Sequence, residues 1–138
     1  MTRVNIVPVE ELSDQHLKAE WNEICRCVKH DYNLTDAPDV YTLGPGHVKW
    51  ARKHARFCFN RYAELEKEMQ YRGFQTNFSA VDLLNRFRNT FINSLDYIVT
   101  NADLEINRAR IMERYLRKPS WYKWTKRSKP VYLEILKW

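Results

Sequence analysis

Residues 47–72, HVKWARKHARFCFNRYAELEKEMQYR, form the longest stretch of the chain in which apolar side chains recur every three or four positions. The apolar positions of this stretch are Val48, Ala51, Ala55, Cys58, Tyr62, Leu65 and Met69. Because this spacing places them on one face of an α-helix, the sequence predicts a helix from about 47 to 72 that buries this face. The turn Gly44-Pro45-Gly46 leads into the helix, and Gly73 ends it.

An earlier helix is predicted from the N-cap Ser13 to about Lys29. Its apolar stripe consists of Leu17, Trp21, Ile24, Cys25 and Val28. The opposite face carries His16, Ala19, Glu23 and Arg26. A small alanine stands there where a long charged side chain is usual, which leaves room for a nucleotide or another chain. The alternative is an ordinary solvated face with one small residue.

A third long helix is predicted from Thr100 or Asn101 to Arg117, and residues 76–99 are expected to be irregular or short-helical. The composition is 44% apolar with only three glycines and five prolines, which favours helices over a turn-rich sheet protein. The length is enough for one core without metal or disulfide support. We therefore expect a compact all-α single domain over residues 1–138, with about three main helices, irregular connections and a basic aromatic C-terminal arm.

The net charge of +6 is unevenly distributed. Residues 41–75 and 107–138 are net positive, whereas residues 1–40 and 76–106 are net negative. This arrangement suits a polyanion held on both sides of a site that contains carboxylates, although a basic surface that binds nothing has the same charge. The cations in the first half of the 47–72 helix, which are predicted to face phosphates, are Lys49, Arg52, Lys53, Arg56 and Arg61.

The C-terminal arm interleaves flat rings with cations. It reads Trp121, Tyr122, Lys123 and Trp124, followed by Lys126, Arg127 and Lys129. Such a mixture can stack on bases while it neutralises phosphate. The alternative is a terminal arm whose aromatic rings pack back onto the helices.

No run of about 18 apolar residues and no signal peptide are present, so a cytoplasmic monomer without membrane contact is expected. The odd number of cysteines, Cys25, Cys27 and Cys58, indicates reduced thiols. A zinc site at Cys25, Cys27 and His30 is weakly supported, because no fourth ligand follows at finger spacing. We expect no metal.

Several blocks of sequence carry a family resemblance. They are Met1-Thr-Arg-Val-Asn-Ile-Val, Asp14-Gln-His-Leu, Ala19-Glu-Trp-Asn-Glu, Leu43-Gly-Pro-Gly-His-Val, Arg72-Gly-Phe, Ala109-Arg-Ile-Met-Glu-Arg and Lys118-Pro-Ser-Trp-Tyr-Lys. In this order and spacing the chain resembles the phage pyrimidine-dimer DNA glycosylases, or UV endonucleases. The resemblance covers most of the chain, with a shorter region at 29–40 and a poor match at 76–99.

The resemblance implies an all-α enzyme that cleaves the glycosidic bond of the 5′ base in a cyclobutane pyrimidine dimer and then breaks the backbone by β-elimination. Its partner is double-stranded DNA with pyrimidine dimers or abasic sites, and it uses no cofactor. It gives Thr2, exposed once Met1 is removed, the place of the nucleophile, and Glu23 that of the catalytic acid. Positions that match the surroundings of the family's site are Arg3, Gln15, His16 and Arg26, and Arg110 and Arg114 match a basic pair near bound DNA.

Three positions near the expected site depart from the phage enzyme. Trp21 stands where it carries tyrosine, Asn22 where it carries arginine and Tyr62 where it carries glutamine. We expect Trp21 and Asn22 to contact DNA as the family positions do. These departures affect the grip on substrate and the shape of the base pocket, but they leave Thr2 and Glu23 unchanged.

An N-terminal amine suits the chemistry that the resemblance implies. A glycosylase that also cuts the strand needs an amine to attack the sugar C1′, because the imine acidifies the neighbouring C2′ proton. An α-amine, with a pKa of about 7.7 to 8.0, is roughly 10 to 20% unprotonated at pH 7, far more than an ordinary lysine. Glu23 can stabilise the cationic sugar and move protons.

Two other classes of protein remain open on the sequence alone. In a helical DNA- or RNA-binding module without enzymatic activity, Glu23 is a surface charge and the Trp-Tyr-Lys-Trp arm supplies the affinity. An adaptor for an acidic partner is a third interpretation. Neither accounts for the match of the N-terminal residues and the polar helix face to catalytic positions.

Overall fold

The computed structural model describes residues 4–29 and 33–134, and every regular element in these ranges is a helix. The α-helices are α1 (Asp14–Glu23), α2 (His47–Lys53), α3 (Ala55–Tyr71), α4 (Ala80–Arg86), α5 (Arg88–Ile92), α6 (Asn101–Arg117) and α7 (Val131–Glu134). Short 3₁₀ turns cover Val9–Glu11, Ile24–Arg26 and Pro119–Trp121. The predicted all-α fold is confirmed. None of the helices described is long and apolar enough to cross a membrane.

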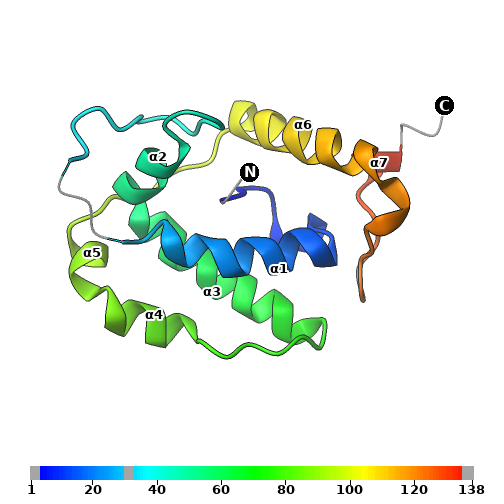
Figure 1. Cartoon of the computed structure of the whole chain (residues 1–138), viewed down its shortest axis with the longest axis horizontal. Coiled ribbons are helices and arrows are strands. Elements are labelled where there is room, and N and C mark those ends of the chain that lie inside the picture. The colour runs from blue at the N-terminus through cyan, green and yellow to red at the C-terminus, as the bar shows by residue number, and fades with distance from the viewer. Residues whose placement is uncertain (1–3, 30–32, 135–138) are drawn as a thin grey trace.

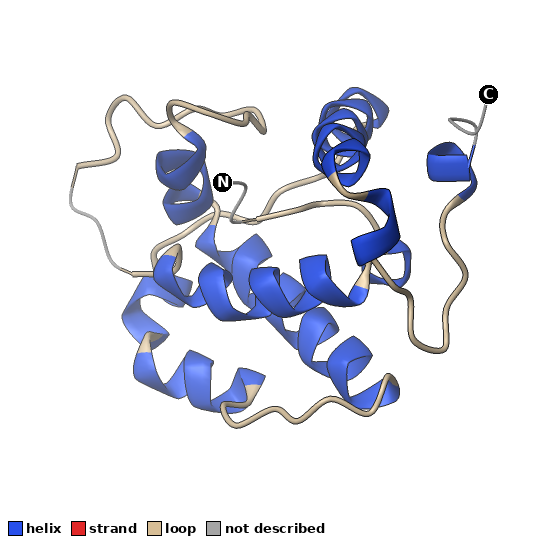
Figure 2. Cartoon of the chain, turned by 45° about the vertical axis from the view of Figure 1, so that its right-hand side comes forward, coloured by secondary structure: helices blue, strands red, loops and turns tan. Residues whose placement is uncertain are grey.

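The α1 and α3 helices lie against each other at the centre of the molecule (Figure 1). The α6 helix lies on one side of this pair, and α4 and α5 lie on the other (Figures 1 and 2). The segment from Val4 to Val7 has no regular secondary structure and runs between α1 and α6. Its buried position makes this extended segment part of the core.

The predicted helix starts are confirmed by their caps. The Ser13 hydroxyl accepts a hydrogen bond from the amide of His16 at 3.0 Å. Thr100 begins α6 with a reciprocal capping box, in which its hydroxyl accepts from the Asp103 amide and the Asp103 carboxylate accepts from the Thr100 amide. Each cap satisfies amide donors that the first turn of a helix leaves open.

The first helix is shorter than predicted. The α-helix ends at Glu23 and continues as the 3₁₀ turn Ile24–Arg26, not as an α-helix to Lys29. Isoleucine, cysteine and valine, which dominate this stretch, are weaker helix formers than the leucine, lysine, alanine and glutamate residues of α1. Because side chains three apart eclipse in a 3₁₀ turn, Cys27 joins Ile24 in the core, while Cys25 is only half-buried.

The single helix predicted over 47–72 is two helices, broken at His54. The backbone of His54 leaves helical geometry, at φ −105° and ψ 41°. Its ring Nδ1 lies 2.8 Å from the carbonyl oxygen of Trp50, which its own amide also reaches. The break frees the carbonyl of Lys53 to accept from the Leu95 amide, which ties the segment before α6 to α2.

Residues 76–99, expected to be irregular or short-helical, contain the two short helices α4 and α5. Ser79 and Asp82 form a second capping box at the start of α4. The α4 and α5 helices pack on α3 through Leu83 and Phe91, whose ring meets Phe59 edge to face. They therefore close the core on the side away from α6.

A buried ion pair joins α1 to α3. Glu20 of α1 accepts from the guanidinium of Arg61 at 2.8 and 3.1 Å, and both side chains are almost inaccessible to solvent. Arg61 also donates to the carbonyl of Val7. The prediction that Arg61 faces phosphates is therefore wrong, because its guanidinium is buried and paired with Glu20 of α1.

Asn107 of α6 continues this network into the N-terminal segment. Its side-chain oxygen accepts from the amides of Ile6 at 2.7 Å and Val7 at 3.1 Å. Its side-chain nitrogen donates to Asn5, which in turn donates to Glu20. The buried polar groups of α1, α3 and α6 thus converge on residues 5–7, and we call this group of Asn5, Glu20, Arg61 and Asn107 the central network.

A second polar cluster fixes the C-terminal arm. Arg72 bonds both Asp14 and Glu68, Arg127 bonds Glu68 at 2.9 Å, and Thr125 bonds Asp14. Burial alone would raise the pKa of Glu68, but hydrogen bonds from Arg127 and Arg72 outweigh it and leave that pKa below its ordinary value. Arg127, expected on a DNA-facing arm, is thus engaged in holding the arm to α3.

Replacing Arg61 by methionine should destabilise the fold strongly. Glu20 would remain buried without its partner, and breaking a buried pair in this way costs about 3 to 5 kcal/mol. Urea unfolding followed by circular dichroism measures the loss. The matched control is Arg117→Met, whose exposed pair with Glu113 contributes less than about 1 kcal/mol.

The double variant Glu20→Gln/Arg61→Met should recover part of the loss, because no uncompensated charge remains in the core. Equal unfolding midpoints for Arg61→Met and Arg117→Met would contradict the importance of the central network.

Candidate functional site

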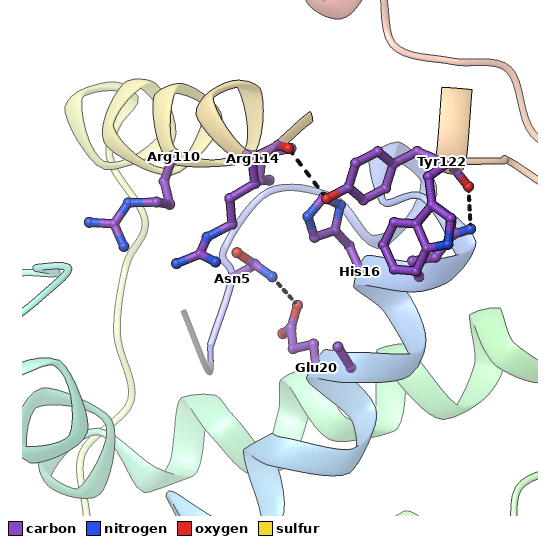
Figure 3. A pocket seen from close by; sticks show the side chains of 10 residues that line it. Asn5, His16, Glu20, Arg110, Arg114 and Tyr122 are labelled. Carbon is purple, nitrogen blue, oxygen red and sulfur yellow. Dashed lines mark hydrogen bonds between the residues drawn. The ribbon is translucent and has the colours of Figure 1, made fainter. Parts of the chain in front are cut away.

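A cavity of about 150 Å³ opens between α1, α6 and the first residues of the C-terminal arm. Its walls come from segments far apart in the sequence, as Figure 3 shows. The lining residues are Asn5, Gln15, His16, Ala19, Glu20, Arg110, Ile111, Arg114, Trp121 and Tyr122. The predicted opening over Ala19 on the polar face of α1 is therefore present, since a longer side chain there would fill part of this space.

Two arginines of α6 give one wall of the cavity its charge. Arg110 and Arg114 are one helical turn apart and extend from α6 toward α1 (Figure 3). The opposing carboxylate, Glu20, is fully buried and already paired with Arg61. The accessible charge at the cavity is therefore positive, and it suits a phosphate or another anion.

His16 forms the end wall and is held as a neutral ring. It stacks on Tyr122, with the ring centroids 4.8 Å apart and the planes 9° from parallel. Its Nδ1 lies 2.9 Å from the Ser13 hydroxyl. Burial, with a further contribution from the charge of Arg114, lowers the pKa of His16 to about 4. At neutral pH this ring adds hydrogen-bonding capacity without charge.

The aromatic arm packs largely back on the helices. The Tyr122 hydroxyl donates to the Arg114 carbonyl, and the Trp124 indole donates to the Glu11 carbonyl at 2.9 Å. Gln15 bridges α1 to the arm by donating to the Trp121 carbonyl and accepting from the Lys123 amide. Only the Trp121 ring remains largely free among the three, at 56% exposed.

Glu23 lies on α1 one helical turn beyond Ala19, on the face that borders the cavity. It is half-buried, and its Oε2 is shielded from solvent with no hydrogen-bond partner in the structure as described. A buried carboxylate oxygen without a partner is costly in an ordinary protein interior, and this oxygen can accept a hydrogen bond that the described residues do not supply.

The remaining predicted site residues fall into three groups. Thr2 and Arg3 lie outside the described residues. Asn22 and Arg26 are exposed on α1 and the turn that follows it. Trp21, predicted both for the core stripe and for DNA contact, is only 7% exposed and stacks on Tyr62, so the structure does not bring it to the cavity.

The cations of α2 lie apart from the cavity. Lys53 pairs with Asp39, and Lys49 donates to the carbonyl of Asn33. Arg52 is half-buried on the same helix. Arg56, the first cation of this run in α3, donates to the carbonyls of Phe91 and Ile92. These residues do not line the cavity, and a contact with DNA there would be a separate one.

The sequence analysis did not predict that three polar residues, Glu20, Arg61 and Asn107, are buried in the central network. Glu20 stands between Leu17 and Ile24 at helical spacing, Arg61 between Cys58 and Leu65, and Asn107 between Leu104 and Ile111. A polar side chain in the middle of an apolar stripe must find a buried partner. That signal was available and pointed to all three.

The described residues bring together no group of three potential metal ligands. His30 of the weakly supported zinc site lies outside them. Cys27 and Cys58 are buried and Cys25 is half-buried, and all three have their sulfur in the thiol form.

Comparison with known families gives one match. A family model described as pyrimidine dimer DNA glycosylase matches residues 1–82, which is more than half of the chain. The matched range contains Thr2, Glu23, the Gly44-Pro45-Gly46 turn before His47 and all of α3. The cavity wall on α6, with Arg110 and Arg114, lies beyond it.

The titration of His16 tests the burial of the cavity wall. We expect its pKa at about 4 by NMR of the ring proton, and a rise toward 6.5 when either neighbour is altered. Tyr122→Ala removes the covering ring and should raise the pKa more than Arg114→Gln, because burial is the larger cause. A wild-type value near 6.5 would show that the stacked arrangement does not persist in solution.

Proposed function

Because the chain belongs to the pyrimidine dimer DNA glycosylase family, a family of DNA-repair enzymes, we propose a specific reaction for it. The amine of Thr2 attacks C1′ of the 5′ nucleotide of a cyclobutane pyrimidine dimer and displaces the base. The C1′–O4′ bond of the sugar ring then breaks, O4′ takes up a proton, and the C1′–nitrogen bond becomes an imine. The imine makes the C2′ proton acidic, and loss of that proton expels the 3′ phosphate by β-elimination. Water then releases the cleaved strand and restores the free amine.

The shielded carboxylate of Glu23 is the observation that carries this proposal. Cleavage of the glycosidic bond builds positive charge on the sugar, and the imine that follows is cationic. A carboxylate oxygen without a hydrogen-bond donor is available to stabilise that charge and to accept the C2′ proton. Had Glu23 been paired like Glu20, it would be neutralised before substrate arrived.

The residues that line the cavity also support this proposal, because they can contact DNA. Arg110 and Arg114 offer phosphate contacts above a space that Ala19 leaves open. Trp121, exposed at the rim, offers a flat ring for a base or sugar. Further contacts with the duplex are proposed at Arg3, Gln15, His16, Asn22, Arg26, Lys49, Arg52, Lys53 and Lys123. For the packed rings of Trp21, Tyr122 and Trp124 we propose support of the site in place of direct stacking.

Borohydride should trap the imine as a covalent adduct between protein and dimer-containing or abasic duplex, and the linkage should map to residue 2. Glu23→Gln keeps the shape of the side chain but removes its charge. It should lower dimer cleavage by at least about 100-fold, the usual scale of lost acid-base catalysis. Its affinity for damaged duplex, measured by fluorescence anisotropy, should stay within about twofold of the wild type.

The matched control is Glu105→Gln, an exposed carboxylate in the first half of α6 that does not line the cavity, which should leave both measurements unchanged. An adduct that maps to a lysine would contradict the proposed nucleophile. Binding without any adduct or nicking would indicate a DNA-binding module that lacks enzymatic activity.

Neutralising Arg110 and Arg114 together should weaken binding to damaged and undamaged duplex alike, because phosphate contacts carry no sequence information. Each lost contact reduces the slope of log affinity against log salt by about 0.9. The control, Arg86→Gln/Arg88→Gln, removes the same charge from α4 and α5 on the other side of the core (Figure 1). Equal changes in slope for the two pairs would show only a nonspecific charge effect.

A further inference from the structure

The backbone of Val4 is held at both of its polar groups by side chains. Its amide donates to Nε2 of His47 at 3.1 Å, and its carbonyl accepts from the Tyr41 hydroxyl at 2.8 Å. Val4 itself is completely buried and belongs to no helix. Since buried amides and carbonyls need partners, these two side chains take the place that a neighbouring strand would fill.

The two contacts of His47 fix one tautomer of its ring. Nδ1 lies 2.8 Å from the Thr42 carbonyl oxygen, which can only accept, so Nδ1 carries the hydrogen. Nε2 is then a bare acceptor, as the contact with the Val4 amide requires. The carbonyl of Thr42 therefore prepares the ring to hold Val4.

The Gly-Pro-Gly turn puts the imidazole in this place. Gly46 adopts φ +90° as the N-cap of α2, directly before His47. A Cβ on Gly46 would meet the ring of Pro38 at 3.0 Å, so both the conformation and the space require glycine. The motif 43–48 is thus explained by the orientation that it gives His47.

Aromatic packing keeps the ring from moving. His47 stacks on Trp50, with centroids 6.2 Å apart, and meets Tyr41 edge to face at 5.8 Å. Tyr41 is fixed in turn, because its amide donates to the Tyr97 hydroxyl, which donates to Asp103 at the start of α6. The support for Val4 therefore reaches from α2 to α6.

We propose that His47 is a positioning residue that sets the place of the N-terminal nucleophile through its hydrogen bond to the amide of Val4. The inference rests on the proposed function, in which the amine of residue 2 attacks the sugar. Only two residues separate that amine from the held amide, so the chain can span no more than about 7 Å between them. Because the connection is this short, we expect a shift of Val4 by about 1 Å to displace the attacking nitrogen, and an error of that size costs on the order of 100-fold in rate.

Two substitutions of His47 test its contacts with Thr42 and Val4 one at a time. His47→Asn can still donate to the Thr42 carbonyl but is too short to reach Val4, whereas the amide oxygen of His47→Gln can occupy the place of Nε2. The control is His54→Asn, which alters another buried histidine packed on Trp50. His54 bonds the Trp50 carbonyl and has no bond to the N-terminal segment among the described residues.

The measurements are the single-turnover rate of borohydride-trapped adduct on abasic duplex, the affinity for that duplex and the unfolding midpoint. We expect His47→Asn to slow adduct formation by about 10- to 100-fold with affinity within twofold. His47→Gln should restore most of the rate. His54→Asn should lose stability to a similar extent but keep the rate. Nitrogen NMR of the wild type should show the ring hydrogen on Nδ1.

The inference is overturned if His47→Asn forms the adduct as fast as the wild type, or if the ring hydrogen of wild-type His47 is on Nε2. It is also overturned if the rate of adduct formation falls in proportion to the loss of stability in all three variants, His54→Asn included. In each case a wild-type adduct at residue 2 leaves the proposed function standing. Failure of the wild type to form that adduct overturns the proposed function, and the inference with it.

Discussion

The rest of the structure depends on one constraint, which is that residues 4–7 are buried without being part of a helix or a sheet. Every amide and carbonyl in such a segment needs a partner that regular structure does not supply. The helices supply it with side chains: Asn107 from α6, Arg61 from α3, and His47 from α2. Glu20 is needed because Arg61 could not be buried with its charge uncompensated.

This constraint also explains the position of the cavity. Asn5 and Glu20, members of the central network, are two of its lining residues. The same α6 helix that offers Asn107 to the N-terminal segment carries Arg110 and Arg114, one and two turns further along. The elements that hold residues 4–7 in the core therefore also carry the two arginines of the cavity wall. Binding and the proposed attack share one scaffold, although they use different side chains.

Much of the fold could be predicted from the sequence because its causes are local. The caps at Ser13 and Thr100 and the long apolar stripes depend on neighbours within one or two turns, and their helices are found where expected. The break at His54 and the 3₁₀ turn after Glu23 do not interrupt the three- and four-residue spacing of the apolar side chains, so this spacing does not reveal them. The docking of the C-terminal arm depends on Arg72 and Glu68, whose partners are more than 50 residues away.

Only part of the candidate site could be predicted from the sequence. Arg110, Arg114 and His16, which are expected to contact DNA, line the cavity, whereas Arg61, predicted to face phosphates, is buried in an ion pair. Net charge cannot distinguish these cases, because it does not show which cations have acids facing them. Glu20, Arg61 and Asn107 interrupt apolar stripes, and that local signal predicts burial with a partner even where the partner is unknown. The roles of Thr2 and Glu23 came from resemblance alone.

The bonds from Asn107 to the amides of Ile6 and Val7 join positions about 100 residues apart. During synthesis, these bonds therefore form later than contacts between residues that are close in the sequence. At roughly 5 to 20 residues per second, a ribosome needs about 5 to 20 seconds after making residues 6 and 7 before it adds their partner. Helices α1 and α3 can meet in the meantime, but the amides of Ile6 and Val7 receive their partner only after α6 has been made. A nascent chain that stalls before α6 therefore lacks the bonds from Asn107 to residues 6 and 7, and its N-terminal segment cannot take the arrangement found here.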